Sequence, residues 1–330
     1  MISNKKLLYL GETFGVHDQR FINALQLNFD VSTFFLEEAE SDSYLRDSNF
    51  DVVIVSPISK QLLNLSIGIN AVKIGICWAI EVNEVKYDES EIEQISSILN
   101  DFSLIIYDAD HISNLIRTQF SYQGNLHKVY FGCSTKELAK IAKDREYSNI
   151  REICVTRNWG PLYRNELILD ALMELGGVYQ LGLTFTAFPP SNFFEIQERM
   201  RRCNIDIRFS GPLEFPELAL RYQESDLYIS AARSDGISVS LLEAMATGII
   251  CIVTDFSSNL EIIKSGINGF TFINGDAKSL SETIQKVLTL SPSERYRIGK
   301  AAQDFVLDKA DWNKNKMFML EKILDLVDVI

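Results

Sequence analysis

The chain has 330 residues, 46% of them hydrophobic and 23% charged, which is more material than one compact core usually takes, so we expect two domains. Its formal net charge of −13 repels phosphate backbones and anionic lipid. We therefore expect no nucleic-acid partner and at most a peripheral membrane contact. No apolar stretch has the length of a membrane span, and the first apolar run, residues 7–10, is too short for a signal-peptide core. These features predict a cytoplasmic protein.

The first half alternates short apolar runs with helical patterns. The runs are continuous rather than alternating, which is typical of parallel strands buried on both faces. We expect strands at residues 7–10, 31–36, 52–56, 73–78 and 104–107, with helices at 20–28 and 91–100.

The second half repeats this pattern, and two consecutive doubly wound α/β units are therefore expected. Its predicted strands are residues 153–156, 183–188, 205–209, 227–231 and 249–254, with helices at 165–175 and 241–247. The polar stretch KDREYSNI, residues 143–150, lacks a core pattern, so we place a first domain at 1–147 and a second at 148–310. Residues 311–330 predict an amphipathic helix that packs on a core.

Cysteines and histidines are scattered without the spacing of a metal site, so no metal is expected. The odd number of cysteines, mostly in apolar runs, favours buried free thiols over disulfides. The residues concerned are Cys77, Cys133, Cys154, Cys203, Cys251, His17, His111 and His127.

Residues 225–272 carry the most chemistry. A predicted strand at 226–231 ends in a polar loop that holds Asp235 and Gly236, and a helix follows that Gly248 stops. The first amides of such a helix have no partner within it and attract phosphate. Glu243 lies in the first helical turns, where a carboxylate can accept the paired hydroxyls of a ribose.

This segment resembles the carboxyl-terminal domain of glycosyltransferase family 4, whose pattern is E-G-F-G-x-x-x-L-E-A-M-A-x-G. The matching residues are Asp235, Gly236, Leu242, Glu243, Ala244, Met245, Ala246 and Gly248. The run EIIKSGINGF, which ends at Phe270, and a distal helix pattern that ends in Trp312 also match. Asp235 stands where the family usually has Glu, and Ser238 stands where it has a second glycine.

The resemblance implies a GT-B fold, in which two Rossmann-like domains face each other across a cleft and the C-terminal helix 311–330 returns to the first domain. It implies a hexosyl-type glycosyltransferase (EC 2.4) that acts with retention, without a metal or another cofactor. The donor is expected to be a nucleotide-sugar, a UDP- or GDP-sugar, and the acceptor a glycan or a lipid-linked acceptor. Polysaccharide biosynthesis is the expected setting.

Carried over by the resemblance, Glu243 would bind the nucleotide ribose and Asp235 would lie beside the donor sugar. The donor-binding residues so implied are Gly11, Gly211, Gly236, Ser238, Val239, Ser240 and Glu243, with the base near residues 211–213. The family also supplies an Arg and a Lys to the diphosphate after the first strand of this domain. Arg157 matches the Arg, and Arg164 is the nearest cation to the Lys position. Arg164 could equally cap or decorate the next helix.

In the first half, Gly11-Glu-Thr-Phe-Gly15 resembles the glycine loop over the donor phosphates. His17, Asp18 and Arg20 fall where the family often contacts acceptor, although the cap of a helix and a solvated face are the alternative. Many relatives carry a histidine near the end of a mid-domain strand, close to the sugar. At that place this chain has Cys-Trp-Ala-Ile-Glu, residues 77–81.

Other patterns point away from other classes. The D-x-D at residues 108–110 is interpreted as the end of an ordinary strand. No G-x-G-x-x-G, P-loop or G-x-S-x-G pattern supports a dehydrogenase, a kinase or a hydrolase. The departures in the motifs keep open a non-catalytic GT-B protein that binds sugar nucleotides or serves as a partner subunit. A sugar-nucleotide epimerase is a third, more distant reading.

Overall fold

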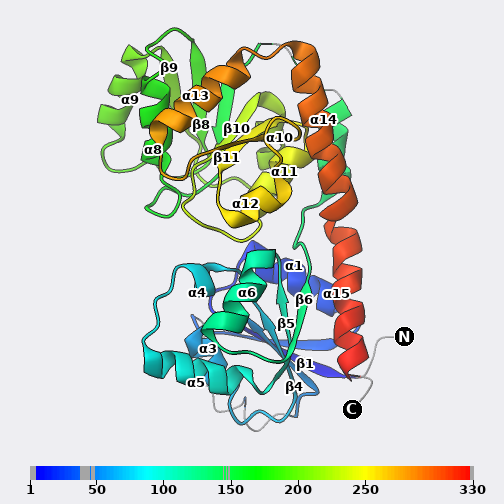
Figure 1. The fold of residues 1–330 in the computed structure, drawn as a ribbon. Helices are drawn as coiled ribbons and strands as arrows, with labels where there is room; N and C mark the ends of the chain where they lie inside the picture. Colours follow the sequence, from blue (N-terminus) through cyan, green and yellow to red (C-terminus); the bar gives the residue numbers. More distant parts are fainter. Residues whose placement is uncertain are drawn as a thin grey trace. The chain divides into compact units, whose positions relative to one another are not determined.

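A computed structural model describes residues 5–37, 45, 49–143, 145, 147 and 149–327. The chain divides into two compact units. The first comprises Met1–Phe131 and Asn313–Ile330, and the second comprises Gly132–Trp312. Each contains one six-stranded parallel sheet with helices packed on it (Figure 1). This confirms the predicted architecture of two doubly wound units.

The sheet of the first unit has the order β2-β1-β3-β4-β5-β6. Its strands are β1 (Lys6–Gly11), β2 (Asp30–Phe35), β3 (Val52–Ser56), β4 (Val72–Ile76), β5 (Phe102–Tyr107) and β6 (Asn125–Lys128). Its helices are α1 (Val16–Leu25), α3 (Lys60–Leu65), α4 (Ile80–Asn83), α5 (Glu89–Leu99), α6 (Asp110–Gln119) and most of α15 (Trp312–Val327). Every residue of β3 and β4 is buried, which explains why these strands read as continuous apolar runs.

The sheet of the second unit has the order β12-β11-β10-β7-β8-β9. Its strands are β7 (Glu152–Val155), β8 (Leu181–Phe185), β9 (Ile205–Phe209), β10 (Leu227–Ser230), β11 (Ile250–Thr254) and β12 (Phe270–Phe272). Its helices are α7 (Thr135–Lys143), α8 (Asn165–Met173), α9 (Phe193–Arg202), α10 (Phe215–Glu224), α11 (Val239–Ala246), α12 (Ser257–Ile262), α13 (Ala277–Leu288) and α14 (Pro292–Lys309).

One face of the second sheet forms a single apolar core with helices α8, α9 and α13. Alternate residues of each strand point to this face, for example Ile153 and Val155 in β7. Residues on the other face are more polar, and they include Tyr228 and Ser230 of β10. Because the strands are parallel, their carboxyl ends meet at one edge, where the loops that follow them gather.

The change from the first to the second unit falls at Phe131 and Gly132, before the boundary that the polar stretch suggested. Helix α7 packs on α10, α11 and α14, so it belongs to the second unit. The half-buried Arg145 donates to the carbonyls of Thr247 (2.9 Å), Ser225 (2.7 Å) and Tyr222 (2.6 Å). The polar character of this stretch therefore serves packing within one unit. Residues 144, 146 and 148 lie outside the described residues.

The C-terminal segment after Trp312 belongs to the first unit, as the resemblance implied. Within that unit, Asn315 Nδ2 donates to the Tyr130 carbonyl at 2.9 Å, and Lys5 Nζ donates to the Val327 carbonyl at 2.6 Å. All five cysteines are free thiols, and all but Cys203 are buried. Among the described residues, no helix is both long and apolar enough to cross a membrane.

Candidate functional site

Two loops meet at the carboxyl-end edge of the second sheet. Strand β10 pairs with β7, so the loops that follow these strands are neighbours. A hydrogen bond of 2.8 Å from the Arg233 backbone N–H to the Leu162 carbonyl joins them. The first loop carries Arg157, and the second carries Asp235 and leads into α11. The topology therefore brings together the residues that the sequence motifs singled out.

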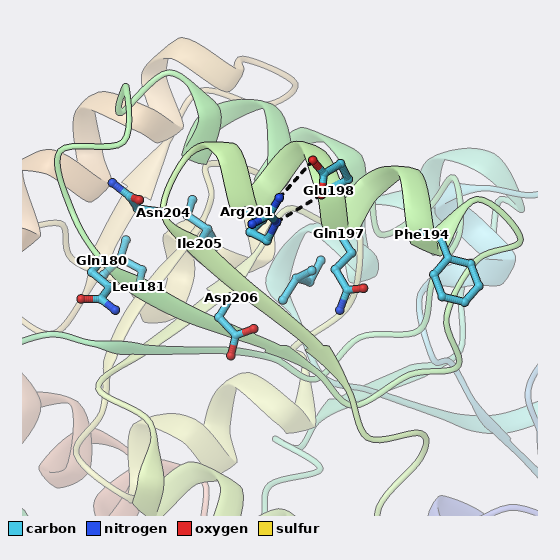
Figure 2. A pocket seen from close by; sticks show the side chains of 10 residues that line it. Gln180, Leu181, Phe194, Gln197, Glu198, Arg201, Asn204, Ile205 and Asp206 are labelled. Carbon is cyan, nitrogen blue, oxygen red and sulfur yellow. Dashed lines mark hydrogen bonds and ion pairs between the residues drawn. The ribbon is translucent and has the colours of Figure 1, made fainter.

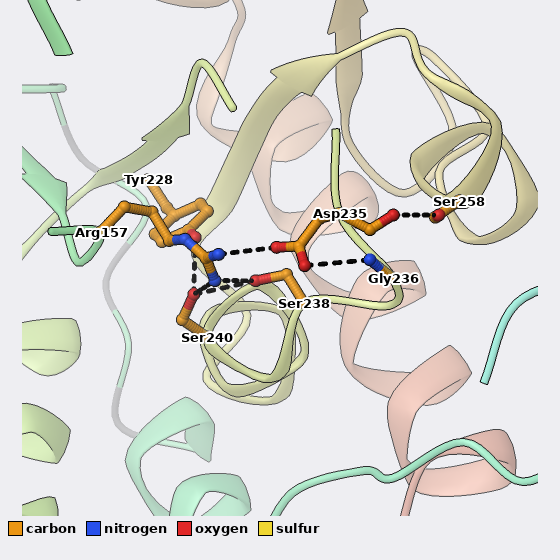
Figure 3. A network of polar contacts seen from close by, with 7 residues as sticks. All are labelled: Arg157, Tyr228, Asp235, Gly236, Ser238, Ser240 and Ser258. Carbon is orange, nitrogen blue, oxygen red and sulfur yellow. Dashed lines mark hydrogen bonds and ion pairs between the residues drawn. The ribbon is translucent and has the colours of Figure 1, made fainter. Parts of the chain in front are cut away.

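Arg157 is the centre of a polar network (Figure 3). Its Nη2 donates to Asp235 Oδ2 at 2.7 Å, and its Nη1 donates to the hydroxyls of Ser238 (2.9 Å) and Ser240 (3.4 Å). The guanidinium also lies over the ring of Tyr163, with Cζ 4.3 Å from the ring centroid. The side chains of Arg157 and Asp235 are only 15% and 17% exposed. A planar cation is thus held in a fixed orientation beside two hydroxyls.

Burial and charge act together on this ion pair. Burial acts to lower the pKa of Arg157, but Asp235 together with Tyr163 and Tyr228 outweighs this, so the pKa is raised. Burial raises the pKa of Asp235 above its ordinary value, and Arg157 offsets part of that rise. Asp235 is also fixed by a hydrogen bond from the Gly236 N–H to its Oδ1 at 2.9 Å. The Asp235 carboxylate is therefore held in place against Arg157.

Helix α11 begins beside this pair. The helix starts at Val239, two positions before the predicted start at residue 241. Ser238 is the residue that precedes the helix. The predicted start was wrong because Val239 and Ser240 have low helix propensity. Their contacts with the neighbouring loop hold them in the helix. Ser240 consequently lies in the first turn, and its hydroxyl is 3.0 Å from that of Ser238. Gly248 follows the helix with a positive φ of 73° and thus ends it as expected.

Glu243 lies one turn into α11 and is partly buried. The hydroxyl of Tyr222 donates to Glu243 Oε2 at 3.3 Å and to the Ser240 carbonyl at 3.2 Å. Burial raises the pKa of Tyr222 well above its ordinary value, so this hydroxyl stays protonated and remains a donor. The hydroxyl of Tyr228 lies 3.1 Å from that of Ser240. The hydroxyls of two buried tyrosines thus hold the side chains of Glu243 and Ser240 in the first turns of the helix.

Arg164 stands at the edge of this network. It precedes α8 in a left-handed conformation with φ 47°. Its Nη1 donates to Asn274 Oδ1 at 2.8 Å, and Asn274 Nδ2 donates to the Arg233 carbonyl at 3.0 Å. Arg164 is therefore linked through Asn274 to the loop that carries Asp235.

The three glycines proposed for donor binding lie in different places. Gly236 is part of the network through its N–H. Gly211 has a positive φ of 75° and follows β9, which is separated from β7 by β8. Gly11 ends β1 in the first unit, where an added Cβ would lie 2.3 Å from the Phe35 ring. The close packing of the Phe35 ring is therefore enough to explain why this position is a glycine.

The acceptor candidates of the first unit lie on α1. The Asp18 carboxylate accepts from the Tyr9 hydroxyl at 2.8 Å and from the Gly15 N–H at 3.1 Å, so it caps the helix. Arg20 Nη2 donates to the Phe131 carbonyl at 3.0 Å. His17 is exposed, and its ring centroid lies 5.3 Å from that of Trp78. Among these candidates, Asp18 and Arg20 hold the unit together, and His17 faces an aromatic side chain.

The D-x-D at 108–110 was interpreted as the end of a strand, but it lies directly after the strand and leads into a helix. Strand β5 ends at Tyr107 and α6 starts at Asp110, whose carboxylate pairs with Lys128 at 2.8 Å. Within the described ranges, no three His, Cys, Asp or Glu side chains gather in a way that could hold a metal ion.

A separate pocket of about 510 Å³ lies in the second unit between α9 and the edge strand β9 (Figure 2). Helix α9 contributes Phe194, Gln197, Glu198 and Arg201, and the other lining residues are Gln180, Leu181, Asn204, Ile205, Asp206 and Ile207. These last residues lie at the starts of β8 and β9. The pocket is therefore at the end of the sheet opposite the Arg157 network, and it is not part of the candidate site.

Sequence reasoning missed several members of the network. Tyr228 was included only as part of a predicted strand. Tyr222 was not considered, and neither was the hydroxyl of Ser258, which donates to the Asp235 carbonyl at 2.7 Å. The signal for the tyrosines was available, because a buried phenol needs a hydrogen-bond partner. Nothing in the local sequence indicates the contact of Ser258, since α12 reaches the loop only through the tertiary fold.

Comparison with solved structures defines the class. The chain is similar to a sucrose-phosphate synthase from Thermosynechococcus elongatus, with 14% identity, a TM-score of 0.79, and coverage of 99% of this chain and 100% of the other. It is also similar to Anabaena HepE, solved in complex with UDP-glucose, with 14% identity, a TM-score of 0.77, and coverage of 97% and 99%. At such identities the likeness shows the fold, and this fold is GT-B.

Residues 190–305 match the family described as "Glycosyl transferases group 1". The matched residues lie within the second unit, which also carries the Arg157 network. An uncharacterized glycosyltransferase of Methanocaldococcus jannaschii, MJ1069, is 23% identical over 217 residues. That match covers 62% of this chain and 54% of the relative, so the chain spans about half the length of this curated relative.

Proposed function

We propose that this protein transfers a sugar from a nucleotide-diphosphate sugar to a hydroxyl of a glycan or another acceptor, with retention of the anomeric configuration. One observation carries the proposal. The Arg157 guanidinium is fixed by Asp235 at the start of α11, beside the hydroxyls of Ser238 and Ser240 and near Glu243. Such a cation next to the first amides of a helix suits a diphosphate, and the nearby carboxylate suits a ribose.

The two terminal nitrogens of the Arg157 guanidinium have different partners, and this supports the proposal. Asp235 takes Nη2, so Nη1 is the side that a phosphate oxygen can take over from the hydroxyls of Ser238 and Ser240. These hydroxyls can then rotate and donate to the same oxygen. An arginine that is oriented in advance stabilises the charge that builds on the leaving diphosphate without a cost of reorganisation.

We propose the following chemistry on this basis. The bond between the anomeric carbon and the diphosphate oxygen breaks, and the negative charge on the departing diphosphate is stabilised by Arg157 and the first amides of α11. The acceptor hydroxyl attacks from the same face, and its proton passes to the departing phosphate oxygen. Glu243 holds the ribose through its carboxylate, which the Tyr222 hydroxyl orients. Arg164 is proposed to add positive charge at the edge of the site.

For the donor we propose a UDP-sugar before a GDP-sugar, because HepE was solved with UDP-glucose and with UDP and glucose. A hexose is the proposed sugar, and no metal or other cofactor is proposed. Transfer should then persist in excess EDTA. Gly211 and Gly11 are proposed to contact the donor through their backbone. His17 on α1 is proposed to contact the acceptor through its side chain.

Cleavage of the donor tests the proposal. The purified protein is incubated with UDP-glucose, UDP-N-acetylglucosamine, UDP-galactose or GDP-mannose, and release of the nucleoside diphosphate is measured without added acceptor. Slow release from at least one donor is expected, because water can replace the acceptor. Glu243→Gln should weaken binding of that nucleoside diphosphate in calorimetry about tenfold, since a hydrogen bond to a charged group is worth about 1.5–3 kcal/mol. The exposed Glu282→Gln on α13 is the matched control. Absence of binding to both UDP and GDP, together with no release from any of the four donors, would refute the proposal.

A second candidate function has one specific observation in its favour. Asp235, which replaces the glutamate of the resembled motif, is engaged by Arg157 at 2.7 Å. If it cannot reach the donor sugar, the protein binds a sugar nucleotide and does not cleave it. Tight binding of a UDP-sugar with no release of UDP, in the wild type and in Asp235→Glu alike, is the result that selects this alternative.

A further inference from the structure

A buried carboxyl group lies at the carboxyl-end edge of the first sheet, outside the network described above. Glu81 follows β4 and is only 4% exposed. Its Oε1 accepts a hydrogen bond from the Trp78 backbone N–H at 3.0 Å. Its Oε2 is buried and has no hydrogen-bond partner among the residues that the structure describes. An ionised carboxylate in such a place is poorly solvated, so the site is sensitive to protonation.

The turn that Glu81 closes is strained. Ala79 has a φ of 78°, which is the left-handed region that costs a residue with a side chain of the order of 1 kcal/mol. Ala79 is fully buried, and the turn persists because Glu81 holds the Trp78 N–H three residues earlier. Strained backbone of this kind is found where a side chain has to be held in an unusual direction. Here the side chain in question is Trp78.

Trp78 is partly exposed and is fixed on several sides. Its indole Nε1 donates to the Ser56 hydroxyl at 2.9 Å. Its ring lies 5.3 Å from those of His17 and Phe21 and 4.5 Å from that of Phe131. The turn, the serine and the aromatic neighbours therefore place one face of an indole at the edge where His17 stands.

Further titratable groups surround Glu81 on the neighbouring elements. The Glu12 carboxylate follows β1, the Cys77 thiol follows β4, and Asp108 follows β5. Tyr87 faces Glu81 from the segment after α4, and His111 of α6 lies 3.5 Å from Asn83 of α4. Most of these groups are acidic or neutral, and no described lysine or arginine forms an ion pair with Glu81. The surroundings therefore oppose its ionisation.

We propose that Glu81 is a positioning residue whose charge state sets the Trp78 indole at the carboxyl-end edge of the first sheet. When Glu81 is ionised, its bond to the Trp78 N–H is charge-assisted and holds the strained turn. When it is protonated, the bond weakens and the turn relaxes. That this edge meets the acceptor rests on the proposed function, whereas the coupling between Glu81 and Trp78 does not.

The electrostatics place this transition near neutrality. Burial raises the pKa of Glu81 to about 7, nearby peptide N–H groups lower it in part, and the Glu12 carboxylate raises it further. A group with this pKa passes from about one tenth ionised at pH 6 to about nine tenths at pH 8. Acceptor-dependent transfer is then expected to rise about tenfold between these pH values.

Indole resonances of the full chain test the proposal directly. The protein is labelled with 15N in its tryptophan rings, and Trp78→Phe identifies the Trp78 Nε1–H signal. That signal should shift with a midpoint near pH 7 in the wild type and should not shift over this range in Glu81→Gln, which keeps the side-chain oxygen that faces Trp78. His17 is the nearest other group that changes charge in this range. In His17→Gln the midpoint should therefore be retained.

Two outcomes overturn the proposal: a Trp78 signal that does not move between pH 5.5 and 8.5 in the wild type, or one whose movement survives in Glu81→Gln. The wild-type experiment decides the first outcome even if the variant does not fold. None of these measurements requires turnover. If the donor-cleavage test fails while the Trp78 signal titrates and Glu81→Gln abolishes the titration, only the functional meaning of the coupling is lost.

Discussion

The two units have nearly the same arrangement of strands and helices, but they carry different functional groups. Both have six parallel strands, and in both the polar side chains gather at the carboxyl ends of the strands. In the second unit this edge carries a fixed cation, Arg157, with its counterion and two hydroxyls. In the first unit it carries an indole, an imidazole and a buried carboxyl group. The first arrangement suits the proposed diphosphate, whose charge it can stabilise. The second has no such cation among these groups, and it is the one proposed to meet the acceptor.

The difference also lies in where charge is compensated. Arg157 Nη2 and Asp235 Oδ2 form an ion pair at 2.7 Å, so each charge has a partner within the second unit. Glu81 has no cationic partner among the described residues, and its pKa of about 7 makes this group of the first unit sensitive to pH.

Arg157→Gln is expected to reduce the rate of donor cleavage by about two to three orders of magnitude, because it removes a preorganised donor to the leaving group. It also leaves Asp235 buried without its cation, so the thermal stability has to be measured alongside. Arg208→Gln, which breaks the exposed pair with Glu152 in the same unit, is the matched control and should leave the rate unchanged. A rate within fivefold of wild type for Arg157→Gln would contradict the assignment of this edge to the diphosphate.

Glu81→Gln is expected to change the dependence of stability on pH. The pKa of Glu81 is raised in the folded state, so its favourable contribution is present below the unfolded pKa of about 4.3 and is lost as the pH rises through about 7. At pH 8 the variant should therefore have a free energy of unfolding about 3 kcal/mol above that of the wild type, and at pH 4 the two should be nearly equal. Urea unfolding at several pH values measures this.

The sign of this effect separates Glu81 from a simple structural residue. Stability should fall with pH over the range in which acceptor-dependent transfer rises. If Glu81→Gln is less stable than the wild type at pH 8, the carboxylate contributes more to the fold than its burial costs, and the contrast between the two units is lost.

Asp18→Ala is expected to lower the free energy of unfolding by about 1 kcal/mol, because it removes the cap of α1. Asp18→Asn should retain most of this stability, since the amide oxygen can still accept from the Gly15 N–H. The two variants therefore distinguish a cap from an acceptor contact. An acceptor KM that rises equally in both, with stability kept in Asp18→Asn, would assign Asp18 to the acceptor after all.

Ser240→Ala is expected to weaken binding of the nucleoside diphosphate about threefold, because one neutral hydrogen bond is worth about 0.5–1.5 kcal/mol. Calorimetry with UDP measures the change. Ser293→Ala on the exposed start of α14 is a suitable control. A loss greater than thirtyfold would mean that the serine, and not Arg157, is the main phosphate contact.

Much of the fold was predictable because strands buried on both faces of a parallel sheet are continuous apolar runs in the sequence. The strands at residues 7–10 and 52–56, among others, are where the patterns placed them. Strands β6 (Asn125–Lys128) and β12 (Phe270–Phe272) were missed, because the first is polar and the second has only three residues. The site was partly predictable for a similar reason. Asp235, Gly236 and Glu243 belong to one contiguous motif, whereas Ser258 and Tyr222 join it only through packing.

The sequence by itself determined the two α/β units, the helix that follows Gly236, and the presence of Arg157 after a strand, because each depends on neighbours along the chain. Only the tertiary structure decided that Asp235 is bound to Arg157, that Asp18 is a helix cap, and that Glu81 is buried beneath Trp78. The physical reason is that the charge state and the direction of a side chain depend on burial and on partners many residues away. In this chain 78 residues separate Arg157 from Asp235.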